Sequence, residues 1–159
     1  MDVVTKFDVE ERSRKAREFF RDGYNCSQSV LLAFQDVIGL PQDTIARISS
    51  GFGGGMGRLR EVCGAVSGMT FMAGVIAPAS HPENREERKV NYALVQEFAE
   101  SFRKQNGSIV CRELLGFRAE HKDSPAPSVR NEQWYTDRPC EGLVGSAARI
   151  IAEKLNSII

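Results

Sequence analysis

Apolar side chains recur at helical spacing along almost the whole chain. The segment 9–21 places apolar residues among charges and is predicted to be a surface helix. A second helix is predicted to follow Asn25, a residue type that often caps a helix N-terminus, and to stop at Gly39. Pro41 then begins a short predicted helix that ends near Ser49, since proline is tolerated in a first turn.

The second half of the chain continues the helical pattern. Helices are predicted from Cys63 to about Ile76, over the long amphipathic stretch 83–104, from Cys111 to Gly116, and after Pro139. The polar, proline-containing segment 121–134 is predicted to be a surface loop. No segment alternates apolar and polar residues over a useful length, so strands are not expected.

The predicted fold is therefore a single all-α domain over residues 1–159, a compact bundle of about six or seven helices. The helix of Cys63 is expected at its centre, because small residues such as Gly64 and Gly68 let neighbouring helices approach closely. The segment 62–80 has no charge and is about as long as a bilayer span, but its glycines and polar residues favour a buried helix in a soluble protein.

A glycine-rich segment precedes this central helix. Gly51-Phe-Gly-Gly-Gly-Met-Gly57 holds five glycines in seven residues and is predicted to be a loop rather than regular structure. It lacks the patterns of the known nucleotide-binding loops. Its amides, with Arg58 and Arg60, are a weak candidate for anion binding. Gly64, Gly68 and, more weakly, Arg58 are the candidates for cofactor binding. The favoured interpretation is that the glycines allow a close backbone approach or a sharp bend beside Cys63.

Composition and charge exclude some classes of function. Lys plus Arg and Asp plus Glu both number 21, so the chain lacks the basic surplus typical of a nucleic-acid binder or a polybasic membrane anchor. The first residues are charged and lack the apolar core of a signal peptide, so a cytoplasmic location is expected. In that reducing compartment cysteines are more often metal ligands or catalytic groups than structural disulfides.

The four cysteines are the candidate site residues. Each lies at or next to a predicted helix N-terminus, where free N–H groups and the helix dipole favour the thiolate, the form that attacks disulfides and ligates metals. Cys63 is predicted to have the most strongly lowered pKa, because Arg58 and Arg60 are near. Cys140 is ranked second, because its helix start favours the thiolate while the neighbouring Glu141 opposes it. At least three of their four sulfur atoms are expected to lie close enough to share a metal or form disulfides. The four residues are Cys26, Cys63, Cys111 and Cys140.

The spacing of these cysteines excludes several familiar sites. There is no Cys-x-x-Cys motif and no Cys-x-x-Cys-His haem attachment motif. The two histidines, His81 and His121, are predicted to be solvated loop residues. A hydrolase that pairs a nucleophile with a histidine base therefore has little support.

Three functions remain open for the cysteines. They can hold an iron–sulfur cluster or another soft metal, or they can work as one or two reversible dithiol pairs. The third is a non-enzymatic zinc-binding, carrier or sensor protein. If the protein is an enzyme, it is expected to be an oxidoreductase. The sequence does not indicate the redox partner, the substrate or whether the chain forms a homodimer.

The order of these residues resembles a known family. Cys26, the run Cys63-Gly-Ala-Val-Ser-Gly68, Cys111 and Cys140 match the C_GCAxxG_C_C family of proteins with four cysteines and a Cys-Gly-Ala-x-x-Gly motif. The resemblance extends from about Tyr24 to the helix after Cys140, and the preceding glycine-rich segment is also similar to the family. It implies redox activity through the cysteines, and a redox or transport partner, because family genes often lie near transporter genes.

Overall fold

The predicted all-α fold is confirmed by the structure, a computed structural model that describes residues 6–116 and 123–159. His121 and the other residues of the gap lie outside this description. Within the described ranges the only extended pairing is one antiparallel bridge between Val62 and Val110. The helices are α1 (Val9–Arg21), α2 (Cys26–Leu32), α3 (Gln35–Ile38), α4 (Gln42–Ser49), the 3₁₀ turn η1 (Ser50–Phe52), α5 (Gly53–Met56), α6 (Gly64–Ile76), α7 (Arg85–Asn106), α8 (Cys111–Leu115), α9 (Glu132–Asp137) and α10 (Cys140–Ser157).

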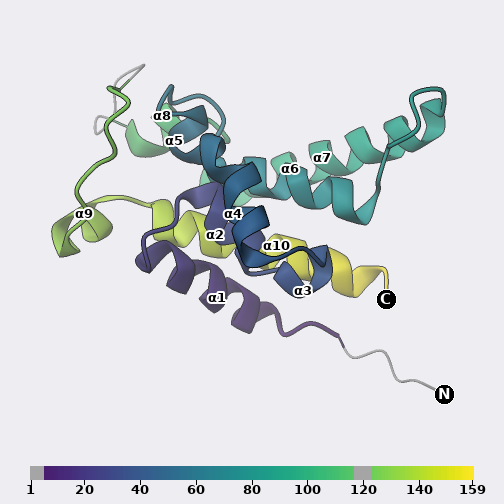
Figure 1. Ribbon diagram of the computed structural model, residues 1–159, viewed down its shortest axis with the longest axis horizontal. Helices are drawn as coiled ribbons and strands as arrows, with labels where there is room; N and C mark the ends of the chain where they lie inside the picture. Colours follow the sequence, from purple (N-terminus) through teal and green to yellow (C-terminus); the bar gives the residue numbers. More distant parts are fainter. Residues whose placement is uncertain (1–5, 117–122) are drawn as a thin grey trace.

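The first and last described helices lie side by side and form the base of the molecule (Figure 1). Helix α2 packs against α1, α6 and α10, and α6 packs against α7. Helices α6 and α7 extend together to one side, and α9 lies at the opposite end (Figure 1). The core between the helices is apolar and sealed from solvent, with fully buried Phe34, Met69, Met72, Phe102 and Ile151.

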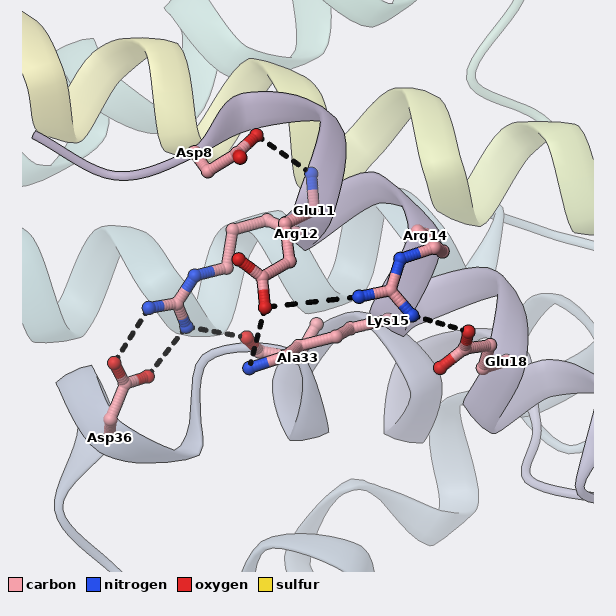
Figure 2. A network of polar contacts seen from close by, with 8 residues as sticks. All are labelled: Asp8, Glu11, Arg12, Arg14, Lys15, Glu18, Ala33 and Asp36. Atoms are coloured by element: carbon pink, nitrogen blue, oxygen red, sulfur yellow. Dashed lines mark hydrogen bonds and ion pairs between the residues drawn. The ribbon is translucent and has the colours of Figure 1, made fainter.

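One predicted helix, from Asn25 to Gly39, is two helices in the structure. Phe34 leaves helical geometry, with φ −123° and ψ 27°, and its side chain is fully buried. The break frees the carbonyl of Ala33, which accepts a hydrogen bond from Arg12 at 2.8 Å. Arg12 also forms a bidentate ion pair with Asp36, in which each N···O distance is 2.6 Å (Figure 2). One side chain of α1 therefore contacts both the end of α2 and α3.

The start of α1 shows why its boundary was predictable. Asp8 precedes the helix in extended backbone geometry, and its carboxylate accepts a hydrogen bond from the amide of Glu11 at 3.0 Å (Figure 2). Such a cap satisfies one of the amides that a helix start leaves without a partner. Aspartate and glutamate near this end also complement the helix dipole.

The glycine-rich segment differs from the predicted loop, because it contains η1 and the single turn α5. Inside that turn Gly54 and Gly55 have φ of +67° and +69°, which winds the backbone left-handed. Left-handed geometry is strained for residues with a Cβ atom, so glycines make the turn possible. The predicted loop 121–134 is also shorter than expected at its end, since Asn131 caps α9 there through a bond from the Trp134 amide of 2.8 Å.

Helices α2 and α6 are in close contact, as the small residues of α6 predict. A Cβ atom added at Gly64 would lie 2.9 Å from Cβ of Cys26, and one added at Gly68 would lie 2.9 Å from Cβ of Val30. Gly74, on the same helix, has open space around it. The uncharged segment 62–80 therefore contains a helix that buries its face toward α2 and exposes Thr70, Gly74 and Val75. Among the described residues no helix combines the length and the apolar character needed to cross a bilayer.

Candidate functional site

All four cysteines stand at helix starts, as predicted, and they lie together. Two of them, Cys26 and Cys140, are half-buried and hydrogen-bonded to each other; we call them the outer cysteines. The other two, Cys63 and Cys111, are buried and close enough to interact electrostatically with the outer cysteines; we call them the inner cysteines. All four are free thiols. These interactions place the four thiols in one neighbourhood, while the predicted close approach of at least three sulfur atoms and their chemical role stay predictions.

Cys26 is positioned by the cap of α2. The side chain of Asn25 accepts a hydrogen bond from the Gln28 amide at 3.0 Å, and the side-chain oxygen of Gln28 accepts one from the Asn25 amide at 2.9 Å. This reciprocal capping box fixes the first turn of the helix, where Cys26 lies. Asn25 also donates to the carbonyl of Ser50 at 2.9 Å. The helix start is thus tied to the segment that leads into the glycine-rich turn.

The inner cysteines are held by two chain segments that run alongside each other. The amide of Cys63 donates to Ile109 at 2.8 Å, and the amide of Cys111 donates to Glu61 at 2.6 Å. Gly55 lies against Cys111, because an added Cβ atom would come within 2.7 Å of the Cβ of Cys111. The favoured interpretation of the glycine-rich segment, a close approach near the site, agrees with this contact.

Arg60 connects one inner cysteine, Cys111, to a carboxylate. Its guanidinium donates to the sulfur of Cys111 at 3.6 Å and to Asp123 at 2.5 and 3.0 Å, and the side chain is almost fully buried. Arg60 and Arg58 both have positive φ, 60° and 66°, which is unfavourable for residues with a Cβ atom. This local strain is the kind that surrounding contacts must stabilise, and it is common at functional sites.

The outer cysteines have opposite pKa shifts. The hydrogen bond from the Cys26 thiol lowers the pKa of Cys140, burial opposes this, and the charges of Arg138, Arg60 and Arg130 lower it further. The same contact with Cys140, together with burial, raises the pKa of Cys26. Within the pair the thiolate form is therefore favoured at Cys140, and Cys26 is the thiol that donates to it.

The prediction that Cys63 has the most strongly lowered pKa is wrong. Burial raises the pKa of Cys63 to about 12, although the nearby backbone amides of Ala65 and Val66 lower it. Desolvation disfavours the charged form of a thiol, and here it exceeds the effect of the helix start. Burial also raises the pKa of Cys111, against the hydrogen bond and charge of Arg60.

A cleft of about 400 Å³ opens beside the outer cysteines. Its walls include the aromatic rings of Phe20 and Trp134, which are stacked with their centroids 5.8 Å apart. No Asp or Glu is among the described residues that line it. The lining residues that carry charge or sulfur are Cys26, Arg58, Arg60, Arg130, Arg138 and Cys140.

Comparison with known families agrees with the arrangement of the four cysteines. The sequence model of the family described as "Putative redox-active protein (C_GCAxxG_C_C)" matches residues 24–154. The chain belongs to this family. No curated protein matches the chain, and no solved structure does. Membership in the family supports redox activity as a general function, and the chemistry must be inferred from the site itself.

The four thiols do not form a metal-ligating set in this structure. Across residues 6–116 and 123–159, no group of three or more His, Cys, Asp and Glu side chains is arranged to hold a metal ion. All four cysteines are within these ranges. The arrangement therefore does not fit the Cys₄ site of an iron–sulfur cluster or a structural zinc ion, which needs four sulfur atoms around one centre.

The weaker candidates from the sequence have different positions. Arg58 lines the cleft and donates to the carbonyl of Ser124 at 2.7 Å. Gly64 and Gly68 are absent from the cleft lining, and they lie in the contact between α6 and α2. Their role as cofactor-binding residues stays a prediction.

The sequence interpretation missed two arginines of the cleft. Arg138 had a signal, since it lies two positions before Cys140 at a predicted helix start. Arg130 had none, because it stands in a polar segment predicted to be a surface loop. Its guanidinium donates to the carbonyls of Phe20 at 2.7 Å and Tyr24 at 3.1 Å, contacts that only the folded chain creates.

Proposed function

We propose that the protein is a thiol–disulfide redox protein in which Cys26 and Cys140 alternate between a dithiol and a disulfide. The single observation that carries the proposal is the direct contact of these two thiols beside an open cleft. A disulfide needs an S–S bond of about 2.05 Å, so the two sulfur atoms must move together from hydrogen-bonding distance when the bond forms. Both residues line the cleft, so a partner disulfide can approach them.

The opposite pKa shifts of the pair assign their roles. Cys140 is the attacking group, because its pKa is lowered and the thiolate is the nucleophile in disulfide exchange. Its place in the first turn of the 18-residue helix α10 adds the positive end of a helix dipole. Cys26, with a raised pKa, holds its proton until the second step.

The exchange proceeds in two balanced steps. The Cys140 thiolate attacks one sulfur of a partner disulfide, the S–S bond of the partner breaks, and its other sulfur leaves as a thiolate that takes up a proton. Cys26 then loses its proton and attacks the sulfur of Cys140. The Cys26–Cys140 disulfide forms, and the remaining partner sulfur leaves and is protonated. Two electrons pass to the partner, and the reverse sequence returns them.

The metal hypotheses from the sequence are the alternative to this proposal. They comprise an iron–sulfur cluster, another thiolate-bound metal, and the zinc site of a carrier or sensor. The arrangement of the described side chains does not fit such a site, so no step is assigned to a metal. Iron, zinc and acid-labile sulfide in freshly purified protein are the direct measurement. A stoichiometric metal held by the four thiolates would favour the alternative.

Trapping and peptide mapping test the dithiol proposal. The reduced protein is treated with hydroxyethyl disulfide, quenched in acid with an alkylating agent, and mapped by mass spectrometry. We expect a Cys26–Cys140 disulfide in the wild type and a mixed disulfide trapped on Cys140 in Cys26→Ser. Cys140→Ser should react at least about tenfold more slowly, because the lowered-pKa thiolate is gone.

Cys111→Ser is the matched control, because it removes a cysteine that does not line the cleft. It should still form the Cys26–Cys140 disulfide. A disulfide between another pair of cysteines in the wild type, or a mixed disulfide trapped on Cys26 rather than Cys140, would contradict the assigned roles.

A further inference from the structure

Arginine charge is concentrated in the cleft beside the outer cysteines, although the whole chain has no net charge. Four guanidinium groups line it, and no Asp or Glu among the described lining residues balances them. A cleft with one sign of charge attracts ligands of the opposite sign and raises their local concentration. The attraction depends on how much of this positive charge is left after the ion pairs within the chain are counted.

One carboxylate serves two of the four arginines. Asp123 pairs with Arg60 at 2.5 Å and with Arg58 at 3.6 Å. Arg58 additionally donates to two uncharged groups, the carbonyl of Ser124 and the hydroxyl of Ser128. This part of the cleft therefore keeps about one unit of positive charge after its internal ion pairs are made.

The other two arginines make no ion pair within the described part of the chain. Arg130 donates to backbone carbonyls, which carry no net charge, and lies 4.4 Å from the ring centre of Phe20. Arg138 lies 4.9 Å from the ring centre of Trp134. Contacts with aromatic faces leave the charge in place. Guanidinium groups of this kind bind carboxylates through paired hydrogen bonds.

The size and walls of the cleft restrict the ligand further. About 400 Å³ suits a small molecule or a short peptide segment rather than a protein surface. The rings of Phe20 and Trp134 give it an apolar side, against which an aliphatic chain can pack. The outer cysteines lie in the same lining, so a ligand held by the arginines has its sulfur atoms near Cys140.

We propose that the cleft binds a small disulfide that carries carboxylate groups, with Arg138 and Arg130 as its principal anion-binding residues. This substrate class rests on the proposed dithiol function of Cys26 and Cys140. In the bound complex the carboxylates pair with the guanidinium groups, and the S–S bond lies within reach of the Cys140 thiolate. The exchange then follows the two steps given above, and the ligand leaves as two anionic thiols.

Three small disulfides of different charge test the substrate class on the whole protein. Glutathione disulfide is anionic, hydroxyethyl disulfide is neutral and cystamine is cationic. The rate of oxidation of the reduced protein should be highest for the anionic probe and lowest for the cationic one. The preference for the anionic over the neutral probe should shrink as salt is added, because salt screens charge.

Arg138→Gln separates binding from thiolate activation. Arg138 also lowers the pKa of Cys140, so its loss slows all three probes, and only the ratio of rates reports on the anion site. We expect the anionic-to-neutral ratio to fall about tenfold, the effect of one charge-assisted hydrogen bond. Arg85→Gln removes the same charge at the start of α7, far from α9 (Figure 1), and should leave the ratio unchanged.

The outcomes distinguish this inference from the proposed function. Formation of the Cys26–Cys140 disulfide at equal rates with all three probes overturns the anionic substrate class and leaves the dithiol function standing. Failure of every probe to form that disulfide overturns the dithiol function. In that case S-methylglutathione, which cannot exchange, tests the anion site alone. Binding to the wild type that Arg138→Gln weakens supports the site, and equal binding to both overturns it.

Discussion

Cys140 and Cys63 have the same local setting but opposite electrostatics. Each stands at the start of a long helix, Cys140 as the first residue of α10 and Cys63 as the cap of α6. The pKa of Cys140 is lowered by the Cys26 hydrogen bond and by the arginines, whereas burial raises the pKa of Cys63 to about 12. A helix start thus favours a thiolate only where donors and charges outweigh desolvation.

The comparison extends to the two halves of the cysteine cluster. The outer cysteines border the cleft and its arginine charge, whereas the inner cysteines are buried and absent from the lining of the cleft. The first arrangement favours exchange with a ligand. The second keeps thiols protonated, as burial does for inert structural cysteines.

The largest expected difference is in reactivity. In reduced protein at pH 7, iodoacetamide should modify Cys140 about 10³-fold faster than Cys63, because a pKa of about 12 leaves very little thiolate on Cys63. A thiolate of higher pKa is intrinsically more nucleophilic, which reduces this difference in rate. Burial of Cys63 limits access of the reagent and increases the difference again. Timed alkylation with peptide mass spectrometry measures both rates. Equal rates in folded protein would show that the helix start outweighs burial.

The second expected difference is in the pH dependence of stability. The folded pKa of Cys63 is raised above the ordinary value of 9.0, so unfolded chains lose this proton first as pH rises, and folding is progressively disfavoured between pH 9 and pH 12. From pH 8 to pH 10.5 the wild type should lose about 2 kcal/mol more unfolding free energy than Cys63→Ala. Urea unfolding under reducing conditions measures this quantity.

Cys140→Ala is the control with the opposite sign. The folded pKa of Cys140 is lowered, so its stabilising effect is present above the unfolded pKa and is lost as pH falls through the folded pKa. The unfolding free energy of the wild type relative to this variant should therefore rise with pH. Parallel pH profiles for the two alanine variants would contradict the assignment of opposite shifts.

The third difference lies within α6, between a glycine packed against α2 and a glycine that faces open space. Gly68→Ala should destabilise the protein by about 1–3 kcal/mol, because the added Cβ atom would lie 2.9 Å from Cβ of Val30. Gly74→Ala on the same helix meets open space and should stabilise by about 0.5–1 kcal/mol, since alanine is the better helix former. Thermal or urea unfolding compares them. Two stabilising substitutions would mean that α6 and α2 are not in close contact.

The parts of the fold set by local interactions were predictable from the sequence. Asn25, Pro41 and Gly107 act at helix ends through their own backbone or side-chain geometry, so neighbouring residues were enough to indicate them. The cysteines followed from the same signals. The break at Phe34 was not indicated, because it arises from the burial of that ring and from the reach of Arg12 across two helices.

The electrostatics of the site depend on contacts that the sequence does not show. Cys63 is buried and its amide is bonded to Ile109, far away in sequence, and no local pattern indicates either feature. The bond between Cys26 and Cys140 likewise joins residues from opposite halves of the chain. Sequence patterns predicted which residues form the candidate site, but the order of their pKa values required the folded arrangement.

The pairing of α1 with α10 has a consequence for how the protein is made. The amide of Phe7 donates to the side chain of Asn156 at 2.7 Å, and Asn156 returns a bond to the carbonyl of Phe7 at 3.0 Å, across 149 positions. Contacts so distant in sequence are slow to form, because a long loop must close first. On the ribosome Cys26 therefore emerges well before Cys140. The contact between Cys26 and Cys140 therefore cannot form until the last helix has been made and has packed against the rest of the chain.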